Sequence, residues 1–417
     1  MRNRLALLTL AACLGGTAQQ ADVLYDEAKV PAFTLPEVLA LRSGERVSDS
    51  KAWTLRRRPE ILAIYEAEVF GKAPAKPSTL KYEVKFPGKG VLGGKADRKI
   101  VTIFFGPPDG PKMDLLLYLP ADAKKPVAVF LGMNFSGIQT VANDPGVPLG
   151  SVWVRGVKAP APESSRGTTA PRWQVEKILA AGYGLAVFDY NEVEPDAVGA
   201  MAQGIRQIFL KPGQTEPGSG AWGAIGAWGW AASRAMDYLE KDRDVDSRHV
   251  ALFGHSRLGK TALWAGALDT RFSIVIANES GEGGAAIARR TYGERTKDLN
   301  VRFPHWFDGN FKRYSAKEEE MPFESPMLMS LIAPRGLYVA SAEEDRWSDP
   351  KGEFLGAAYA SAAWDLFGRK GISTIEMPGL HHPVGDHVRY HIRAGKHDVT
   401  AYDWEQYLKF AAAEWAK

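Results

Sequence analysis

One stretch, from His249 to Gly284, restricts the fold of this chain more than any other part of the sequence. The apolar run Val250 to Phe253 is too short for a helix and stops at Gly254, which is typical of a buried strand. From Lys260 to Leu268, Ala and Leu recur at helical spacing, and a second apolar run follows. The pattern predicts a strand, a sharp turn, a helix and another strand, with Ser256 on the turn.

Ser256 is the candidate nucleophile. A serine on a tight turn between a strand and a helix holds its hydroxyl above the edge of the sheet. The backbone N–H of the next residue lies near the helix N-terminus, where it can stabilise an oxyanion. Gly254 and Gly259 leave room for the close backbone approaches that such a turn requires. The alternative is an ordinary turn in which Ser256 caps the helix, because serine is a preferred N-cap residue.

Strand and helix patterns alternate along the chain, which predicts an α/β protein with a parallel sheet covered on both faces. This order is that of the α/β-hydrolase fold, a three-layer sandwich around a mostly parallel central sheet. We expect one catalytic domain over 19–417, with insertions near 143–172 and 289–325. The expected helices are 36–42, 59–70, 173–181, 225–240, 260–268 and 402–415. The expected strands are 82–86, 99–105, 113–119, 126–131, 184–190, 250–253, 274–277, 336–340 and 388–393.

The loop Gly132 to Gly137 is the candidate source of a second oxyanion donor. It follows the strand predicted at 126–131. In this fold class the other N–H of the oxyanion hole comes from the loop after the third strand.

A serine hydroxyl needs an imidazole to take its proton, and that imidazole needs a partner on its other nitrogen. Most of the histidines lie near the C-terminus, where the hydrolase order of serine, acid and histidine places the base. We choose His397, in a glycine-containing loop after 388–393, and keep His381 and His382 as the alternative. No HExxH motif accompanies the paired histidines, so we expect no metal and no cofactor.

The usual order of the hydrolase fold offers three candidates for the acid that orients the imidazole. The common hydrolase arrangement places the acid after the strand 336–340, where Glu343, Glu344 and Asp345 follow. The alternative interpretation of these three residues is a solvated loop.

The nucleophile block, Gly254-His255-Ser256-Arg257-Leu258-Gly259-Lys260, departs from the generic Gly-x-Ser-x-Gly turn, because Leu258 occupies the last position. The block resembles the glucuronoyl esterases, carbohydrate esterases whose fungal members carry Gly-Cys-Ser-Arg-x-Gly-Lys at the nucleophile. His255 stands in place of that cysteine, so any disulfide that the fungal members make there is absent. The resemblance continues at 278–284, 331–337, 395–398 and 402–404, and more weakly, in the manner of the bacterial branch, at 57–62 and 70–72.

The resemblance implies roles for several residues. It points to Glu279 as the acid of a Ser-His-Glu triad, with Asp345 as a second contributor. Arg257 would help to stabilise the oxyanion, and Lys260 would hydrogen-bond hydroxyls of a uronate, although both could equally be exposed helix residues. Trp347 is similar to the aromatic wall of the family, and Glu294 lies where a polar sugar contact is expected.

The resemblance also implies a substrate. Glucuronoyl esterases cleave the ester between the carboxyl of a (4-O-methyl-)glucuronic acid branch of glucuronoxylan and a lignin alcohol. The chain is therefore expected to act on lignin–carbohydrate esters through an acyl-enzyme. An acetyl-xylan esterase, another hydrolase of this fold and a non-catalytic carbohydrate-binding relative stay open as alternatives. The last is disfavoured, because no triad position is missing.

The N-terminus predicts a secretory leader over 1–18, since a basic start is followed by the apolar run Leu5 to Leu14 and by small residues. That run is shorter than the roughly 20 residues that span a bilayer. Leu10-Ala11-Ala12-Cys13 also fits the box at which bacterial lipoproteins are cleaved and acylated. We therefore expect a secreted or periplasmic protein, with a lipid anchor at Cys13 as an equal alternative that would make it an outer-membrane lipoprotein.

The net charge and the cysteine content exclude several kinds of partner and site. The formal net charge is only +3, so nothing marks the chain as a nucleic-acid binder. Cys13 is the single cysteine, which leaves the mature chain without a disulfide or a thiolate metal site. We expect a monomer without a membrane span.

Overall fold

The structure is a computed structural model that describes residues 23–416, apart from residues 79, 108, 125, 155, 156 and 216. The predicted leader, with Cys13, lies outside the described residues. Within the described part of the chain, no helix is both long and apolar enough to cross a membrane.

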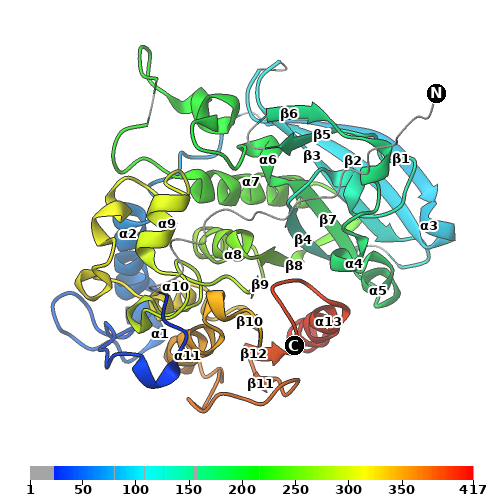
Figure 1. The fold of residues 1–417 in the computed structure, drawn as a ribbon. Coiled ribbons are helices and arrows are strands. Elements are labelled where there is room, and N and C mark those ends of the chain that lie inside the picture. Colours follow the sequence, from blue (N-terminus) through cyan, green and yellow to red (C-terminus); the bar gives the residue numbers. More distant parts are fainter. Residues whose placement is uncertain are drawn as a thin grey trace, which may run out of the picture.

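A ten-stranded sheet forms the centre of the molecule (Figure 1). In the order in which they lie side by side, its strands are β1 (Lys81–Gly90), β2 (Ala96–Phe104), β3 (Lys112–Pro120), β7 (Gly184–Asp189), β4 (Val127–Asn134), β8 (Val245–His255), β9 (Ile274–Asn278), β10 (Gly336–Ala342), β12 (Val388–Arg393) and β11 (Val384–Gly385). The six strands from β7 to β12 in this order run parallel. Antiparallel strands complete both edges. Each predicted strand overlaps an observed one.

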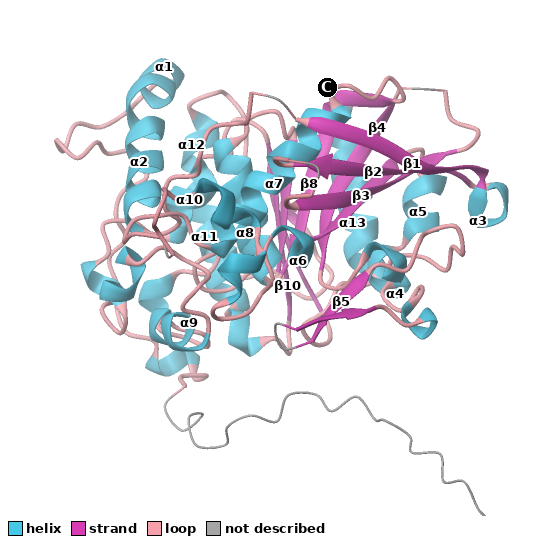
Figure 2. Cartoon of the chain, turned by 90° about the horizontal axis from the view of Figure 1, so that it is seen from above, coloured by secondary structure: helices cyan, strands magenta, loops and turns pink. Residues whose placement is uncertain are grey.

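Helices cover both faces of this sheet (Figures 1 and 2). Successive residues of a strand point to opposite faces, and here Leu131 and Leu252 join one apolar cluster while Phe130 and Phe253 join another. The first cluster includes residues of α2 (Arg58–Glu68), α7 (Ala224–Leu239), α8 (Arg257–Leu268), α10 (Ser325–Ser330) and α11 (Pro350–Ala360). The second includes residues of α5 (Val175–Ala180) and α13 (Ala401–Trp415). The predicted three-layer α/β-hydrolase architecture is confirmed.

The remaining helices are short and lie between the main elements. They are α1 (Ser50–Ala52), α3 (Val91–Gly94), α4 (Ala170–Trp173), α6 (Tyr190–Val193), α9 (Thr296–Arg302) and α12 (Ala362–Asp365). Of these, α9 belongs to the predicted insertion 289–325, which also contains short 3-10 turns.

The helix predicted over 36–42 is wrong. The segment is a series of turns, and its backbone groups bond to other parts of the chain. The guanidinium of Arg57 donates to the carbonyl oxygens of Glu37 and Val38, both at 2.9 Å. The N–H of Val47 donates to the carbonyl of Leu39 at 2.7 Å. These partners occupy the carbonyls that a helix would pair internally.

The insertion predicted at 143–172 is more ordered than its composition indicated. A two-stranded antiparallel hairpin, β5 (Ser151–Val154) and β6 (Val157–Pro160), lies within it, and α4 begins before its end. The hairpin strands are only four residues long each. Such short strands leave a weak periodic pattern among the proline, glycine and serine residues.

The order of the strands indicates where in the sheet a ligand site is expected. The chain runs from β4 to β7 on one side and later returns to β8 on the other side of β4. Open α/β sheets bind ligands at such a reversal, beyond the carboxyl ends of the strands. The candidate residues Ser256, Glu279, Asp345 and His397 follow the neighbouring strands β8, β9, β10 and β12 at this end.

Candidate active site

Ser256 occupies a sharp turn between β8 and α8. Its backbone has φ 58° and ψ −130°, a conformation that a residue other than glycine adopts at a cost of about 1–3 kcal/mol. The Ser256 N–H donates to the carbonyl of Asn278 at 2.9 Å, and its own carbonyl accepts from the N–H of Gly259 at 2.8 Å. Its side chain makes no capping bond to α8, so the interpretation of Ser256 as an ordinary helix cap is wrong.

Two glycines make this turn possible. A Cβ on Gly254 would lie 1.8 Å from the carbonyl oxygen of Leu258, a distance that no side chain can occupy. A Cβ on Gly259 would lie 2.9 Å from the Cβ of Ser280. Gly254 therefore lets the strand fold back on the helix, and Gly259 lets the helix approach the loop after β9.

His397 meets two carboxylates on one ring nitrogen. Its Nδ1 lies 2.6 Å from Oδ2 of Asp345 and 3.0 Å from Oε2 of Glu279. Burial alone would lower the pKa of His397, but its hydrogen bonds with Asp345 and Glu279 outweigh this and raise it. The structure thus brings both acid candidates of the sequence to the same imidazole.

Glu279 is the more firmly held of the two acids. Its side chain is fully buried, and its backbone also has a positive φ, of 47°. Oε1 accepts from the guanidinium of Arg393 at 2.6 Å, and Oε2 accepts from the N–H of Asp398 at 3.0 Å. Burial raises the pKa of Glu279 to about 7 against the opposing effect of His397.

Asp345 is the second carboxylate at the same ring nitrogen. Burial would raise the pKa of Asp345, but the hydrogen bond with His397 outweighs it and holds that pKa below its usual value. The alternative base candidates lie elsewhere, since His382 is exposed and bonds the carbonyl of Leu380 at 2.8 Å. His381 packs against the ring of Tyr402.

A pocket of about 330 Å³ opens beside Ser256 and His397. The three predicted substrate residues and both acid candidates line it, together with further residues of the insertion 289–325. Its lining comprises Ser256, Arg257, Lys260, Glu279, Ser280, Glu294, Arg302, Phe303, Trp306, Asp345, Trp347, Ser348 and His397.

One wall of this pocket is a hydrogen-bonded row of three predicted residues. Glu294 accepts from Nζ of Lys260 at 3.0 Å and from Nε1 of Trp347 at 3.1 Å. Lys260 also donates to the carbonyl of Ser280 at 2.7 Å. Since an ammonium has three protons, these two bonds leave Lys260 one further donor for a ligand.

Phe303 and Trp306 form an aromatic wall of the pocket that the sequence does not predict. The rings of Phe303 and Trp306 stack with centroids 3.8 Å apart. The guanidinium of Arg302 lies 5.3 Å from the ring of Trp347. These residues belong to the insertion, where no strand end or motif marks a side chain as part of a site; the cluster of aromatic and basic residues from Arg302 to Trp306 is the one signal available.

Arg257 points from the nucleophile turn toward this wall. Its guanidinium lies 5.0 Å from the ring of Trp306, and one of its nitrogens donates to Asp196. The predicted second oxyanion loop, Gly132 to Gly137, is absent from the residues that line the pocket. The N–H of Gly137 donates instead to the buried carboxylate of Asp189 at 2.9 Å.

Two groups of described residues have side chains of the kinds that bind metals. They are His255, Glu279 and His397 in the site, and Asp386, His387 and Glu414 near the C-terminus. In the first group, Nδ1 of His255 bonds the side-chain oxygen of Asn278 at 2.6 Å and Nδ1 of His397 meets the two acids. In the second, an Arg369 nitrogen lies 3.3 Å from Nδ1 of His387, which opposes the entry of a cation.

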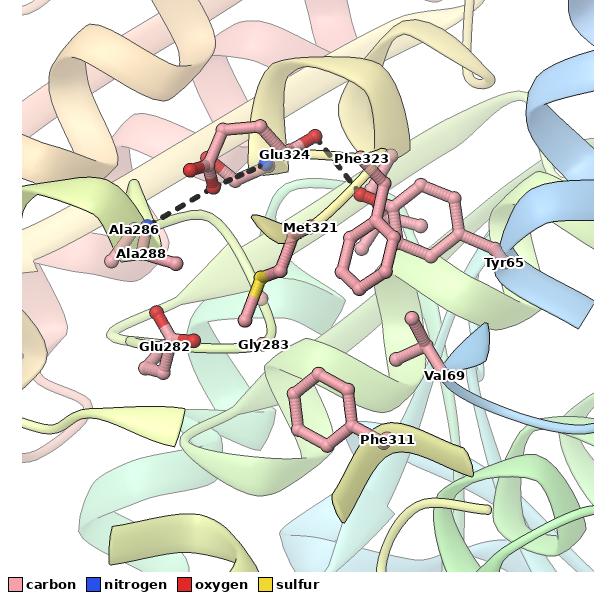
Figure 3. Close-up of a pocket in the computed structure, with 13 residues that line it drawn as sticks. Tyr65, Val69, Glu282, Gly283, Ala286, Ala288, Phe311, Met321, Phe323 and Glu324 are labelled. Atoms are coloured by element: carbon pink, nitrogen blue, oxygen red, sulfur yellow. Dashed lines mark hydrogen bonds between the residues drawn. The ribbon is translucent and has the colours of Figure 1, made fainter. Parts of the chain in front are cut away.

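A second, much smaller cavity lies behind the loop that follows Glu279 (Figure 3). Glu282, Glu324, Met321, Phe311 and Tyr65 are among its lining residues. Its volume of about 20 Å³ holds roughly one water molecule. It is too small for a sugar.

Comparisons with known proteins identify relatives of the chain. A family model described as "Glucuronyl esterase, fungi" matches residues 215–368. The chain is 46% identical over 401 residues to Carbohydrate esterase MZ0003 from an unknown prokaryotic organism, covering 94% of this chain and 92% of that protein. A solved glucuronoyl esterase from Solibacter usitatus is 70% identical, with a TM-score of 0.91, and covers 93% of this chain and 100% of its own.

A second solved structure, described as a promiscuous esterase of carbohydrate esterase family 15 from the marine bacterial metagenome, is 45% identical. Its TM-score is 0.88, with 94% of this chain and 100% of that chain covered. The resemblance seen in the nucleophile block is thereby confirmed. The chain is an esterase and belongs to the glucuronoyl esterases of carbohydrate esterase family 15.

Proposed function

We propose that the protein hydrolyses the ester between the carboxyl of a (4-O-methyl-)glucuronic acid branch of glucuronoxylan and a lignin alcohol. The observation that carries the proposal is one pocket in which Ser256 and His397 face a wall of Lys260, Glu294 and Trp347. A uronate offers its hydroxyls to the ammonium of Lys260 and the carboxylate of Glu294, and an apolar ring face to the indole of Trp347.

In the proposed reaction, Nε2 of His397 takes the proton of the Ser256 hydroxyl as Oγ attacks the ester carbonyl. The oxyanion that forms meets the backbone N–H of Arg257, at the start of α8, and its guanidinium. The imidazolium then protonates the departing alcohol. The uronyl group stays on Ser256 until water, deprotonated by His397, releases the acid.

We assign the orienting role to the two carboxylates together. The imidazolium that forms during attack needs a negative partner on Nδ1. Asp345 makes the shorter contact with that nitrogen, at 2.6 Å. Glu279, fixed by Arg393 and by the N–H of Asp398, meets the same nitrogen at 3.0 Å.

Glu294 sets the geometry of sugar binding in this proposal. Its two oxygens accept from Lys260 and Trp347, so it fixes the ammonium and the indole relative to each other. The third proton of Lys260 is then directed at a uronate hydroxyl. No metal or cofactor takes part in these steps.

A broader ester specificity is the second candidate, because the marine relative at 45% identity is described as promiscuous. Rates on a glucuronic acid methyl ester and on acetylated xylan separate the two. Faster turnover of the uronate ester supports the proposal, and faster release of acetate supports an acetyl-xylan esterase. Binding without turnover of either would support a carbohydrate-binding relative.

We further propose that the protein works outside the cytoplasm, as a monomer with a single catalytic domain over 19–417. The leader predicted over 1–18 supports export, and a substrate in plant cell walls requires it. Lipidation at Cys13 stays an alternative to plain cleavage. Mass spectrometry of the exported protein distinguishes them, since an acylated N-terminal cysteine is heavier by its lipid chains.

A further inference from the structure

Four side-chain donors converge on the carboxylate of Asp196. Oδ1 accepts from Nε2 of His305 at 2.8 Å and from Nε1 of Trp306 at 2.7 Å. Oδ2 accepts from the hydroxyl of Tyr190 at 2.9 Å and from the guanidinium of Arg257. The Asp196 side chain is only 7% exposed, so these donors replace nearly all of its hydration.

The donors come from three separate parts of the chain. Tyr190 begins α6 directly after β7, and Arg257 begins α8 at the nucleophile turn. His305 and Trp306 belong to the insertion 289–325. One carboxylate therefore ties the nucleophile turn to the aromatic wall of the pocket.

Arg257 depends on this carboxylate for its direction. Its guanidinium lies among the rings of Trp306, Phe303 and Phe135, at 5.0, 5.8 and 5.5 Å from their centroids. Aromatic faces attract a cation but do not fix its rotation. Its Nε is buried and makes no hydrogen bond within the described residues. Among the residues that the structure describes, its directional bonds run only from the nitrogen that reaches Asp196 and, at 3.4 Å, the hydroxyl of Tyr190.

We propose that Asp196 is a positioning residue of the reaction, which holds the Arg257 guanidinium in the orientation that meets the oxyanion. The proposal rests on the oxyanion role proposed above for Arg257. The carboxylate acts through Arg257 and has no contact with substrate. Its bond to Trp306 also fixes the aromatic wall of the pocket relative to the same guanidinium.

The backbone of the insertion does not depend on Asp196. The carbonyls of His305 and Trp306 accept from the first N–H groups of α7, those of Ala224 and Ile225, at 2.9 and 3.1 Å. Asp196→Asn should therefore fold. Its amide oxygen can still accept from His305 and Trp306, whereas its NH₂ group would face the Arg257 guanidinium, where donor meets donor.

A double-mutant cycle with Arg257→Met tests the proposal, with kcat measured on a glucuronic acid methyl ester. Arg257→Met should lower kcat about a hundredfold, as loss of one oxyanion donor does. Asp196→Asn should lower kcat about tenfold in the wild type and less than about twofold in the Arg257→Met background, because residues in contact are not additive. Tyr190→Phe, which removes one hydroxyl from the same cluster, should give a smaller loss of the same pattern.

Asp144→Asn is the matched control. Asp144 is also buried and accepts from an arginine, Arg98 at 2.6 Å, and from a tyrosine, Tyr118 at 2.9 Å, but it does not line the pocket. It should leave kcat unchanged in both backgrounds. An equal loss from Asp196→Asn in both backgrounds, or none in the wild type, overturns the positioning role and leaves the oxyanion role intact. An unchanged kcat in Arg257→Met overturns both.

Discussion

The imidazole ring of His255 lies against that of His397, with centroids 4.5 Å apart and planes inclined by 37°. His255 is 5% exposed, and its Nδ1 bonds the side-chain oxygen of Asn278 at 2.6 Å. Burial, together with the charge of His397, holds the pKa of His255 well below its ordinary value. A neutral, fixed ring therefore forms one wall for the proposed base, at the position where fungal relatives carry cysteine.

This contact predicts different losses for two His255 variants. His255→Phe keeps a ring against His397 and should retain kcat to within about threefold, whereas His255→Ala should lose about tenfold, the rate equivalent of one aromatic pair. Steady-state kinetics on a glucuronic acid methyl ester measure both, with thermal melting as a check on folding. Equal kcat values for the two variants would show that the packing of the His255 ring against His397 does not support catalysis.

Removal of the Ser256 hydroxyl should lower kcat by several orders of magnitude. Ser256→Ala and Ser256→Gly should be equally inactive, yet Ser256→Gly should melt at the higher temperature, because glycine adopts φ 58° without strain. Calorimetry and ester hydrolysis measure the two effects separately. Activity within about tenfold of the wild type would exclude Ser256 as the nucleophile.

The two acids should support each other. In Glu279→Gln or Asp345→Asn one carboxylate still faces Nδ1 of His397, so each should lose about 10- to 100-fold in kcat. The double variant should lose about 10⁴-fold, as when a triad aspartate becomes an amide. A single variant that is already as poor as the double variant would identify its residue as the sole orienting acid.

The same two carboxylates predict the pH dependence. They raise the pKa of His397, so the ring stays protonated to a higher pH and the basic form that accepts the Ser256 proton appears only above it. The value of kcat/KM should therefore rise with pH, and the midpoint of this limb should lie above about 6.5, the ordinary pKa of histidine. Asp345→Asn removes one negative charge, which should move the limb to lower pH. An unmoved limb in that variant would contradict the assignment, once spontaneous alkaline hydrolysis is subtracted.

Lys260→Ala should separate sugar recognition from chemistry. Loss of one hydrogen bond from a charged donor should lower kcat/KM for glucuronate esters roughly ten- to a hundredfold. Small acetyl esters, which have no hydroxyl to place against Lys260, should change by less than about twofold. Equal losses on both substrates would mean that Lys260 acts through its bond to the Ser280 carbonyl, as support for the loop after β9.

Features of the site with a local cause could be predicted from the sequence. The apolar run before Gly254 and the block around Ser256 determine the nucleophile turn, since its steric demands involve residues a few positions apart. The order of serine, acid and histidine together with the family resemblance indicates His397, and the resemblance indicates Glu279. Asp345, the second carboxylate at His397, follows from strand order. The helix expected at 36–42 failed because Arg57, from a later segment, bonds its carbonyls.

The residues that escaped prediction act across long separations in the chain. Asp196 and Trp306 meet only because the insertion folds over α7 and α8, and no periodicity records that contact. Arg393, which holds Glu279, lies on a strand whose pattern indicates only its burial. The hydrogen-bond partners of a side chain are set by tertiary packing, which leaves no trace in neighbouring residues.

The position of β12 in the chain has a further consequence. His397 follows this strand, whereas Ser256, Glu279 and Asp345 follow the strands β8, β9 and β10. Pairing of β12 with β10, from Leu337 and Val388 to Ala342 and Arg393, carries His397 to the two carboxylates. Ester hydrolysis is therefore a readout of the docking of β12 onto β10, a step that the nucleophile turn alone does not report.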